Sequence, residues 1–214
     1  MKDLSFKFPD SKILVFCKAP IFGTVKTRLL SVLSKKQATE LHIRLATQTI
    51  NQAIKSQLCP VEIWCSPNID HPFFQAFEAG LKQQKGKDLG ERMHHALQTT
   101  LTQCSSAILI GTDCPSMTID DLDQAFTKLE EGSDIVIAPA EDGGYTLIGL
   151  KKIQGKKKVR SIFKNIDWGT SKVFDQTISK INKLDLYCYK LSMQWDVDRP
   201  EDFRRYVDSQ KNNH

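Results

Sequence analysis

The segment that most constrains the fold runs from Ala107 to Thr118 and reads AILIGTDCPSMT. Four apolar residues lead into Gly111, and a single carboxylate, Asp113, follows shortly before a proline. A short continuous apolar run is typical of a parallel strand that is buried on both faces, and open α/β sheets bind ligands beyond the carboxyl ends of such strands. The segment therefore predicts a central strand over 107–110 and puts Asp113 where a metal or ligand would bind. The alternative interpretation is that the Asp113 side chain only hydrogen-bonds its own turn.

Strand-like and helix-like patterns alternate along the rest of the chain, as they do in α/β folds. The first strand, first helix and second strand should form a parallel, right-handed unit. We therefore expect a mostly parallel central sheet with helices on both faces. Strands are predicted over 12–17, 61–65, 107–110, 134–139, 145–150 and 186–191, and helices over 34–56, from Pro72 through Leu81, around 93–101, after Thr118, from Thr170 or Ser171, and from Pro200.

Length and composition favour one domain over residues 1–214, because 40% of the residues are hydrophobic and can fill a core of ordinary size. No serine- or glycine-rich linker, internal repeat or low-complexity tract marks a boundary. No apolar run approaches the roughly 18 residues of a membrane span, and the first residues are too polar for a secretory signal. We expect a cytoplasmic protein without a membrane partner, and any self-association to be a homodimer.

The cysteines and the charged residues exclude other classes of site. Six cysteines without a CxxC pair indicate reduced, packed thiols, and Cys114 is interpreted as a small packing residue because a reactive thiol needs a lowered pKa. His42, beside the apolar stripe of the first helix, is interpreted as packed. Much of the net charge of +5 lies in segment 151–164, which lacks a series of aromatic side chains for stacking on bases. That segment favours a solvated loop or a phosphate-attracting flap over a nucleic-acid interface.

The first predicted strand runs directly into KAPIFGTVKTRL, where Lys18, Lys26 and Arg28 place three cations within eleven residues. A proline and a glycine between them disfavour helix. Phosphate oxygens are bound best by backbone amides together with Lys and Arg, so the loop is a candidate cradle for a di- or triphosphate. A Walker A loop is excluded because valine, rather than glycine, stands before the Lys-Thr pair. Ordinary surface charge at the start of a helix is the alternative.

The loop KGKDLGERM leads into another predicted helix and carries candidates for contacts with a base or ribose. These candidates are Asp88 and Arg92. Capping of the helix N-terminus by Asp88 explains the same pattern without a ligand.

The predicted strand over 134–139 ends in AEDGGYTLIGL, where Glu141 and Asp142 precede two glycines. A backbone without side chains beside carboxylates lets a sugar or another small acceptor lie flat against it. A tight turn into the following strand is the alternative. Trp168 further along is interpreted as a core anchor rather than as a pocket wall.

The closing motif WDVDRPED carries two further carboxylates, Asp196 and Asp198. In an extended chain both would point to the same side, although Asp198 is placed to cap the helix that starts at Pro200. Mg²⁺ binds one or two carboxylates together with water and substrate phosphates. Asp113 and Asp196, converging from two strand ends, would provide such a site.

Together these motifs resemble a known family. KAPxxGxVKTRL, DLGERM, IGTDCP, APAEDGGYTLIGL, IDWGTSxVxxQT and DVDRPED follow in the order found in a bacterial family of domains of unknown function. That family is assigned to the GT-A, nucleotide-diphospho-sugar transferase superfamily and includes glycosyltransferase-like proteins of arsenosugar pathways. Parts of the chain are also similar to 2-phospholactate guanylyltransferase and to molybdenum cofactor nucleotidyltransferases. The resemblance spans about 13–206 and implies a Rossmann-like GT-A fold.

The resemblance also implies roles for individual residues. It places the loop cations on nucleotide phosphates, DLGERM near the base or ribose, and the EDGG turn at the acceptor or sugar. The donor motif DxD of GT-A glycosyltransferases reads DCP here, with a single carboxylate. The implied sets are catalytic Lys26, Arg28 and Asp142; metal-binding Asp113 and Asp196; and nucleotide-binding Lys18, Ala19, Pro20, Gly23, Lys26, Thr27, Arg28, Asp88, Gly90, Arg92, Gly143 and Gly144.

The sequence thus predicts a transferase that uses Mg²⁺ or Mn²⁺ and a nucleotide-activated donor with a small-molecule acceptor. Transfer of a sugar from a nucleotide sugar is the leading hypothesis. The first alternative is a nucleotidyltransferase that couples a nucleoside triphosphate to a phosphorylated small molecule and releases pyrophosphate. The second is a non-catalytic nucleotide-binding regulatory protein.

Overall fold

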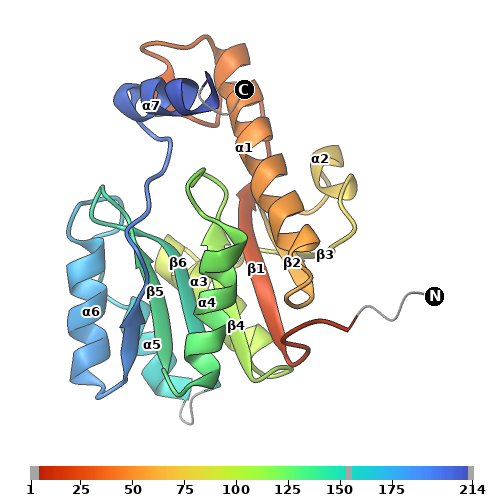
Figure 1. Ribbon diagram of the computed structural model, residues 1–214. Coiled ribbons are helices and arrows are strands. Elements are labelled where there is room, and N and C mark those ends of the chain that lie inside the picture. Colours follow the sequence, from red (N-terminus) through yellow and green to blue (C-terminus); the bar gives the residue numbers. More distant parts are fainter. Residues whose placement is uncertain (1–4, 153–155, 212–214) are drawn as a thin grey trace.

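The computed structural model describes residues 5–152 and 156–211, and its centre in those residues is a seven-stranded sheet (Figure 1). The strand order is β3-β2-β1-β4-β6-β5-β7. β6 is antiparallel to β4 and β5, and the other neighbouring strands pair in parallel, which confirms the α/β class. The strands are β1 (Ser11–Lys18), β2 (Val61–Ser66), β3 (Gly80–Gln83), β4 (Ser106–Gly111), β5 (Ile135–Pro139), β6 (Tyr145–Lys151) and β7 (Cys188–Lys190).

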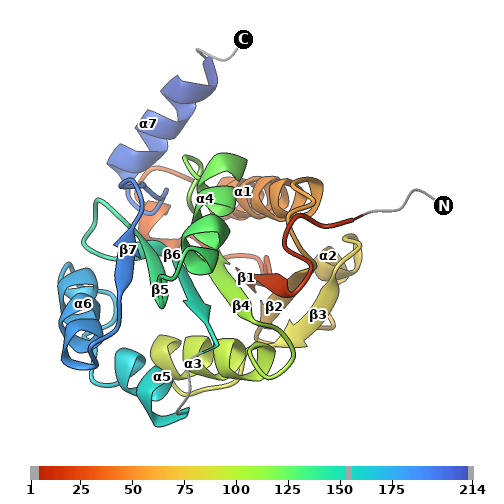
Figure 2. The same ribbon diagram turned by 60° about the horizontal axis from the view of Figure 1, so that its bottom comes forward.

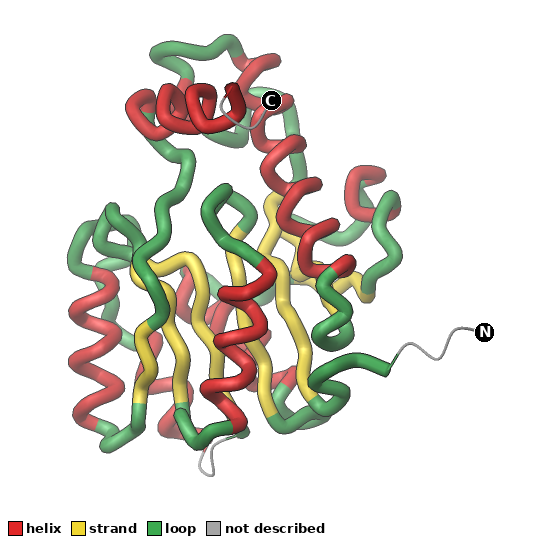
Figure 3. Tube along the Cα trace, viewed as in Figure 1, coloured by secondary structure: helices red, strands yellow, loops and turns green. Residues whose placement is uncertain are grey.

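Helices cover both faces of this sheet (Figures 2 and 3). α1 and α4 share one core cluster with the sheet, whereas α3, α5 and α6 share a second cluster on the opposite face. In the described residues, no helix is both long enough and apolar enough to span a membrane. The helices are η1 (Thr27–Leu29), α1 (Lys35–Lys55), α2 (Pro72–Gln75), α3 (Leu89–Thr100), α4 (Ile119–Glu130), α5 (Lys156–Phe163), α6 (Val173–Lys183) and α7 (Pro200–Lys211).

Burial of the central strands on both faces explains their continuous apolar sequences. Ile13 and Val15 of β1 pack into the first cluster, while Leu14 and Phe16 pack into the second. Because alternate side chains point to opposite faces, a strand covered by helices on both sides must be apolar throughout. Because β1 pairs in parallel with β2 and β4, the carboxyl ends of these three strands meet at one edge of the sheet.

Several predicted boundaries are confirmed and others are wrong. The helices predicted after Ser34 and Thr118 begin with capping boxes at those residues. The helix predicted from Pro72 through Leu81 is wrong beyond Gln75, because Leu81 instead pairs with Ile63 in the edge strand β3. An edge strand buries few side chains, so its sequence carries little strand periodicity.

Three further differences lie in the last quarter of the chain. α6 starts at Val173 after Lys172, so neither Thr170 nor Ser171 is its N-cap. The last strand covers only Cys188–Lys190 of the predicted 186–191. α7 does start at Pro200, but Asp198 directs its carboxylate to Arg28, while Asp202 accepts hydrogen bonds from the amides that precede the helix.

A third cluster lies beyond the carboxyl ends of the strands and attaches α7 to α1. It contains Leu29 of η1, Leu41 and Leu45 of α1, Val197 and Tyr206, all of them buried. In Figure 1, α7 lies at the same end of the molecule as the start of α1, above the strand ends. This cluster fixes the loop that carries Lys26 and Arg28 relative to the segment that carries Asp196.

Replacement of Leu29 by Ala should therefore destabilise the protein by about 2–5 kcal/mol, because the side chain is completely buried and leaves a cavity. Val32→Ala is the control, since Val32 is 46% exposed and its truncation should cost less than about 0.5 kcal/mol. Urea unfolding followed by circular dichroism measures both free energies. Equal losses in the two variants would show that the third cluster contributes no specific packing.

Candidate functional site

One extended segment, residues 191–199, crosses the carboxyl ends of the strands and builds the site. The Gln194 amide donates to the Pro139 carbonyl at 2.8 Å, and the Val197 amide donates to the Asp113 carbonyl at 2.9 Å. The Ser116 hydroxyl donates to the Gln194 side chain at 2.7 Å and ties the segment to the loop after β4. These bonds bring the carboxylates at the end of the chain to the end of the central strand.

Four carboxylates converge where this segment passes β4. Burial, together with the negative charges of Asp142, Asp113 and Asp198, raises the pKa of Asp196 to about 6, and burial is the largest of these causes. In residues 5–152 and 156–211, no three His, Cys, Asp or Glu side chains are arranged to hold a metal ion. Two carboxylates suffice for Mg²⁺ when water and substrate phosphates supply the other ligands. Asp113 and Asp196, in an excess of negative charge, fit that requirement.

The cations of the loop after β1 contact these carboxylates. Lys26 has a side chain that is only 3% exposed, and its Nζ lies 2.8 Å from Asp113 Oδ1 and donates to the Val197 carbonyl at 2.6 Å. Arg28 Nη1 donates to the Asp198 carboxylate, which raises the pKa of the guanidinium. Loop cations and acidic residues that lie far apart in sequence are thus paired with each other.

The remaining loop residues shape the backbone. Lys18 Nζ donates to the Thr24 carbonyl at 2.7 Å. Gly23 has a φ of +73°, a conformation that favours glycine. Ala19 and Pro20 are buried, so only their backbone could meet a ligand, whereas Thr27 is exposed.

Two cavities meet at Arg28 and Asp198. The first, of about 650 Å³, lies over the ends of β1 and β4. The second, of about 490 Å³, lies between the turn after β5 and the start of α7. The first is lined by Phe16, Lys18, residues 24–28, His42, Ser66, Gln84, Leu89, Arg92, Gly111, Thr112, Asp113 and Asp198, and the second by Arg28, Glu141, Asp142, Gly169, Thr170, Ser171, Trp195, Asp196, Asp198, Arg199, Glu201 and Asp202.

The candidate residues of the DLGERM motif line two different cavities. Arg92 lines the 650 Å³ cavity and its Nε donates to the Gly86 carbonyl at 3.2 Å. Asp88 instead caps α3 by accepting from the Glu91 amide at 2.8 Å. A Cβ at Gly90 would lie 2.7 Å from the Trp168 ring, so this glycine permits close packing. Asp88 and Gly90 line a separate cavity of about 200 Å³.

One glycine of the turn after β5 is required for steric reasons. Gly143 has a φ of +86°, and a Cβ there would lie 2.2 Å from the Ser171 carbonyl oxygen. Asp142 accepts from the Gly144 amide at 2.8 Å, which closes the turn. The close approach places residues 169–171 opposite Asp142 in the second cavity. The segment therefore forms a tight turn and also places Asp142 beside a cavity, so the two interpretations of this segment do not exclude each other.

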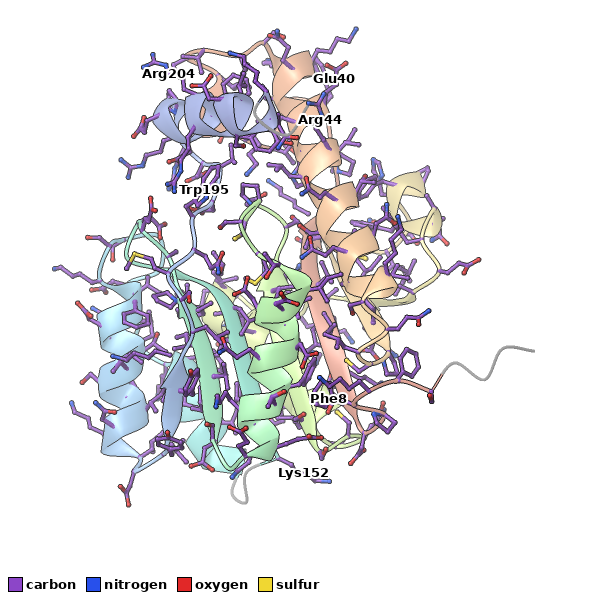
Figure 4. The ribbon with its side chains drawn as sticks, in the orientation of Figure 1. Phe8, Glu40, Arg44, Lys152, Trp195 and Arg204 are labelled. Atoms are coloured by element: carbon purple, nitrogen blue, oxygen red, sulfur yellow. The ribbon has the colours of Figure 1, made fainter. Side chains whose placement is uncertain are left out.

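The second cavity has an aromatic wall that the sequence did not indicate. Trp195, which Figure 4 shows between α7 and the strand ends, lies 4.3 Å from the Arg205 guanidinium carbon, and Arg205 pairs with Glu141 at 2.8 Å. Trp168 packs against Tyr145 in the second core cluster, as predicted for a core anchor. Its neighbours Gly169 and Thr170 line the cavity instead. The glycine in the sequence WGT was the one available signal of a turn there, and Gly169 has a φ of +80°.

Three further predictions concern Cys114, His42 and the basic segment 151–164. The Cys114 thiol is buried, which raises its pKa, and this confirms a packing role. His42 is buried, with Nε2 2.8 Å from the Lys18 carbonyl oxygen, and burial lowers its pKa. Lys152, at the start of the basic segment, lies at the end of the molecule opposite Trp195 (Figure 4). Residues 153–155 and the side chains of 156–158 of that segment lie outside the described part.

Comparisons with known proteins agree with this architecture. A sequence profile for the family described as “Uncharacterized protein conserved in bacteria (DUF2064)” matches residues 49–170, more than half of the chain. A crystal structure from Desulfovibrio desulfuricans G20, of a protein assigned to the nucleotide-diphospho-sugar transferases, is 31% identical and has a TM-score of 0.87. That match covers 95% of this chain and 89% of the other. No curated protein sequence matches.

Two more distant structures show the fold alone. CMP:2-keto-3-deoxy-manno-octonic acid synthetase complexed with CTP is 7% identical with a TM-score of 0.63, over 96% of this chain and all of the other. Glucosyl-3-phosphoglycerate synthase from Mycobacterium tuberculosis, in complex with Mn²⁺, UDP and glucosyl-3-phosphoglycerate, is 11% identical with a TM-score of 0.50, over 92% and 75%. The fold is that of the nucleotide-diphospho-sugar transferases.

Replacement of Asp196 by Asn should stabilise the protein at pH 8 and change little near pH 4. The carboxyl has a pKa of about 6 in the folded protein and an ordinary value of 3.8, so the folded state binds the proton more tightly. Stability of the wild type must then fall as the pH rises from about 4 to about 6, and Asn removes that loss. We expect a gain of about 1–3 kcal/mol above pH 6, measured by urea unfolding in EDTA. A variant no more stable than wild type at pH 8 would contradict the assignment.

Gly143→Ala should cost more stability than Gly169→Ala. Both glycines have positive φ, but only at Gly143 would the new Cβ meet backbone atoms, because nothing lies within 4 Å of Gly169. We expect about 1 kcal/mol for Gly169→Ala from conformation alone, and at least about 2 kcal/mol for Gly143→Ala. Thermal unfolding of the two variants measures the difference. Equal costs would mean that residues 169–171 do not approach the turn as closely as described.

Proposed function

The chain belongs to the bacterial DUF2064 family, and we propose that it is a metal-dependent transferase that moves a sugar from a nucleotide-activated donor to a hydroxyl group of a small acceptor. The observation that carries this proposal is the meeting of two cavities of different charge at Arg28 and Asp198. One suits a nucleotide diphosphate and the other suits an uncharged polyhydroxylated molecule.

The first cavity supports binding of the nucleotide. It lies beyond the carboxyl ends of β1 and β4, where open α/β sheets take their ligands. Lys18, Lys26, Arg28 and Arg92 line it and can neutralise the oxygens of a diphosphate. A divalent cation on Asp113 and Asp196 would add charge neutralisation of the leaving diphosphate.

The second cavity supports a hydroxyl acceptor. Six carboxylates line it against two guanidinium groups, Arg28 and Arg199. An acceptor that carries a phosphate would enter this negative field at an electrostatic cost, whereas carboxylates accept hydrogen bonds from sugar hydroxyls. Trp195 offers an apolar wall beside them. The charge of this cavity therefore favours glycosyl transfer over nucleotidyl transfer to a phosphorylated acceptor.

In the proposed reaction, an acceptor hydroxyl attacks the anomeric carbon of the donor sugar while the bond from that carbon to the diphosphate oxygen breaks. Asp142 takes the hydroxyl proton, because Glu141 is already paired with Arg205. Lys26 and Arg28 stabilise the charge that grows on the departing nucleoside diphosphate. Catalysis then rests on positioning and electrostatic stabilisation.

Nucleotidyl transfer remains the second candidate because of the cation count at the first cavity. Four cationic side chains match the charge of a nucleoside triphosphate better than that of a nucleotide sugar. In that reaction an acceptor phosphate would attack the α-phosphorus, and pyrophosphate would leave. A non-catalytic binding protein would bind the same ligands without turnover.

A thermal-unfolding screen separates these functions. Nucleotide sugars, nucleoside diphosphates and nucleoside triphosphates are added with and without Mg²⁺ or Mn²⁺. A ligand at a hundredfold excess over its dissociation constant stabilises by about 2.7 kcal/mol, which for a chain of this size raises Tm by about 5–10 °C. We expect metal-dependent stabilisation by a nucleotide sugar, followed by release of nucleoside diphosphate when an acceptor is supplied. Asp113→Asn should remove the metal-dependent part of the shift.

Stabilisation by a triphosphate alone would replace the proposal with nucleotidyl transfer. Stabilisation without turnover against a broad set of sugars and polyols would favour the binding protein. If Asp113→Asn leaves both the metal dependence and the turnover unchanged, Asp113 is not a metal ligand.

A further inference from the structure

Lys26 occupies an unusual position for a residue expected to meet a ligand. Its side chain is 3% exposed, whereas the Asp113 side chain that it contacts is 44% exposed. In the described residues, the buried Asp113 Oδ1 makes no well-formed hydrogen bond, and its contact with a cation is the ion pair with the Lys26 ammonium at 2.8 Å. The second contact of Lys26 Nζ is the Val197 carbonyl at 2.6 Å.

The backbone holds Lys26 in this position. Lys26 has a φ of 50° and a ψ of 38°, the left-handed conformation, directly before η1. Its carbonyl accepts from the Leu29 amide at 3.0 Å, and Leu29 is anchored in the third cluster. The backbone conformation and the anchored Leu29 therefore place the Lys26 ammonium beside Asp113.

An ammonium and a divalent cation cannot share this carboxylate without cost. Two positive charges a few ångströms apart repel strongly at the low effective dielectric of a partly buried site. Lys26 also lines the first cavity, where a phosphate would offer its Nζ another partner on the end of a flexible stem.

We propose that Lys26 is the resident counter-ion of Asp113, and that a divalent cation binds Asp113 only when the Lys26 ammonium moves onto the phosphates of the nucleotide. This inference rests on the proposed function, since it concerns the same metal and nucleotide. Metal alone then binds weakly, and metal and nucleotide bind with positive coupling. The coupling would keep the metal out of the site until the donor arrives.

The test measures binding of Mn²⁺ alone, without nucleotide, by electron paramagnetic resonance of the free ion at pH 8. Lys26→Met removes the ammonium but keeps an unbranched side chain of similar length. Lys18→Met is the matched control, because it removes the same charge from the same cavity while Lys18 Nζ contacts the Thr24 carbonyl and not Asp113. If Lys26→Met does not fold, Mn²⁺ binding is measured for Lys26→Gln in its place, because the glutamine amide retains a donor for the Val197 carbonyl.

We expect Lys26→Met to bind Mn²⁺ about tenfold more tightly than wild type or better, and Lys18→Met to gain less than about threefold. Adding Asp113→Asn to Lys26→Met should abolish the gain. Wild type that binds Mn²⁺ as tightly as Lys26→Met, equal gains in the two lysine variants, or no Mn²⁺ binding by any variant would each overturn the inference.

This result is independent of the nucleotide-sugar screen. If a nucleotide sugar stabilises the protein in a metal-dependent way but Lys26→Met binds Mn²⁺ no more tightly than wild type, only the counter-ion role of Lys26 is defeated. Tighter Mn²⁺ binding by Lys26→Met without stabilisation by any nucleotide defeats the proposed function instead, and it leaves only the role of Lys26 as counter-ion of Asp113 intact.

Discussion

The site depends on the hydrogen bond from the Val197 amide to the Asp113 carbonyl, because this bond attaches the segment before α7 to the loop that follows the central strand β4. Together with the bonds from Gln194 to Pro139 and from Ser116 to Gln194, it fixes the position of Asp196 relative to Asp113. The same peptide region offers the Val197 carbonyl to Lys26. One short stretch of backbone thus positions a carboxylate from the C-terminal segment and an ammonium from the first loop, although they lie about 170 residues apart.

The charges of the site follow from this arrangement. Negative groups gather because the turn after β5, the end of β4 and the crossing segment each bring carboxylates to one place. Such a cluster is costly to bury unless cations balance it, and Lys26 and Arg28 from the loop after β1 supply the balance. Carboxylates are in excess in the cavity on one side of Arg28 and cations in the cavity on the other, so the two cavities differ in charge.

Much of the fold was predictable because burial on two faces leaves a strong signal. The apolar run before Asp113 identified β4, and the helices predicted over 34–56 and after Thr118 correspond to α1 and α4. Leu81 was misassigned because an edge strand next to a four-residue helix has no clear period. The wall formed by Trp195 was missed because only the tertiary path of the crossing segment turns that side chain toward the cavity.

Some of the predicted site residues have a structural explanation in their immediate surroundings, and others do not. Asp88 and Gly143 have structural explanations in a helix cap and a close backbone approach, and sequence alone could not separate these from ligand contacts. Lys26 differs, because its buried ammonium is neither surface charge nor an exposed phosphate ligand in this conformation. A chain that needed only a stable core would bury an apolar side chain there, since a buried ion pair is seldom worth its desolvation. A site that must exchange one cation for another has a reason to keep the lysine.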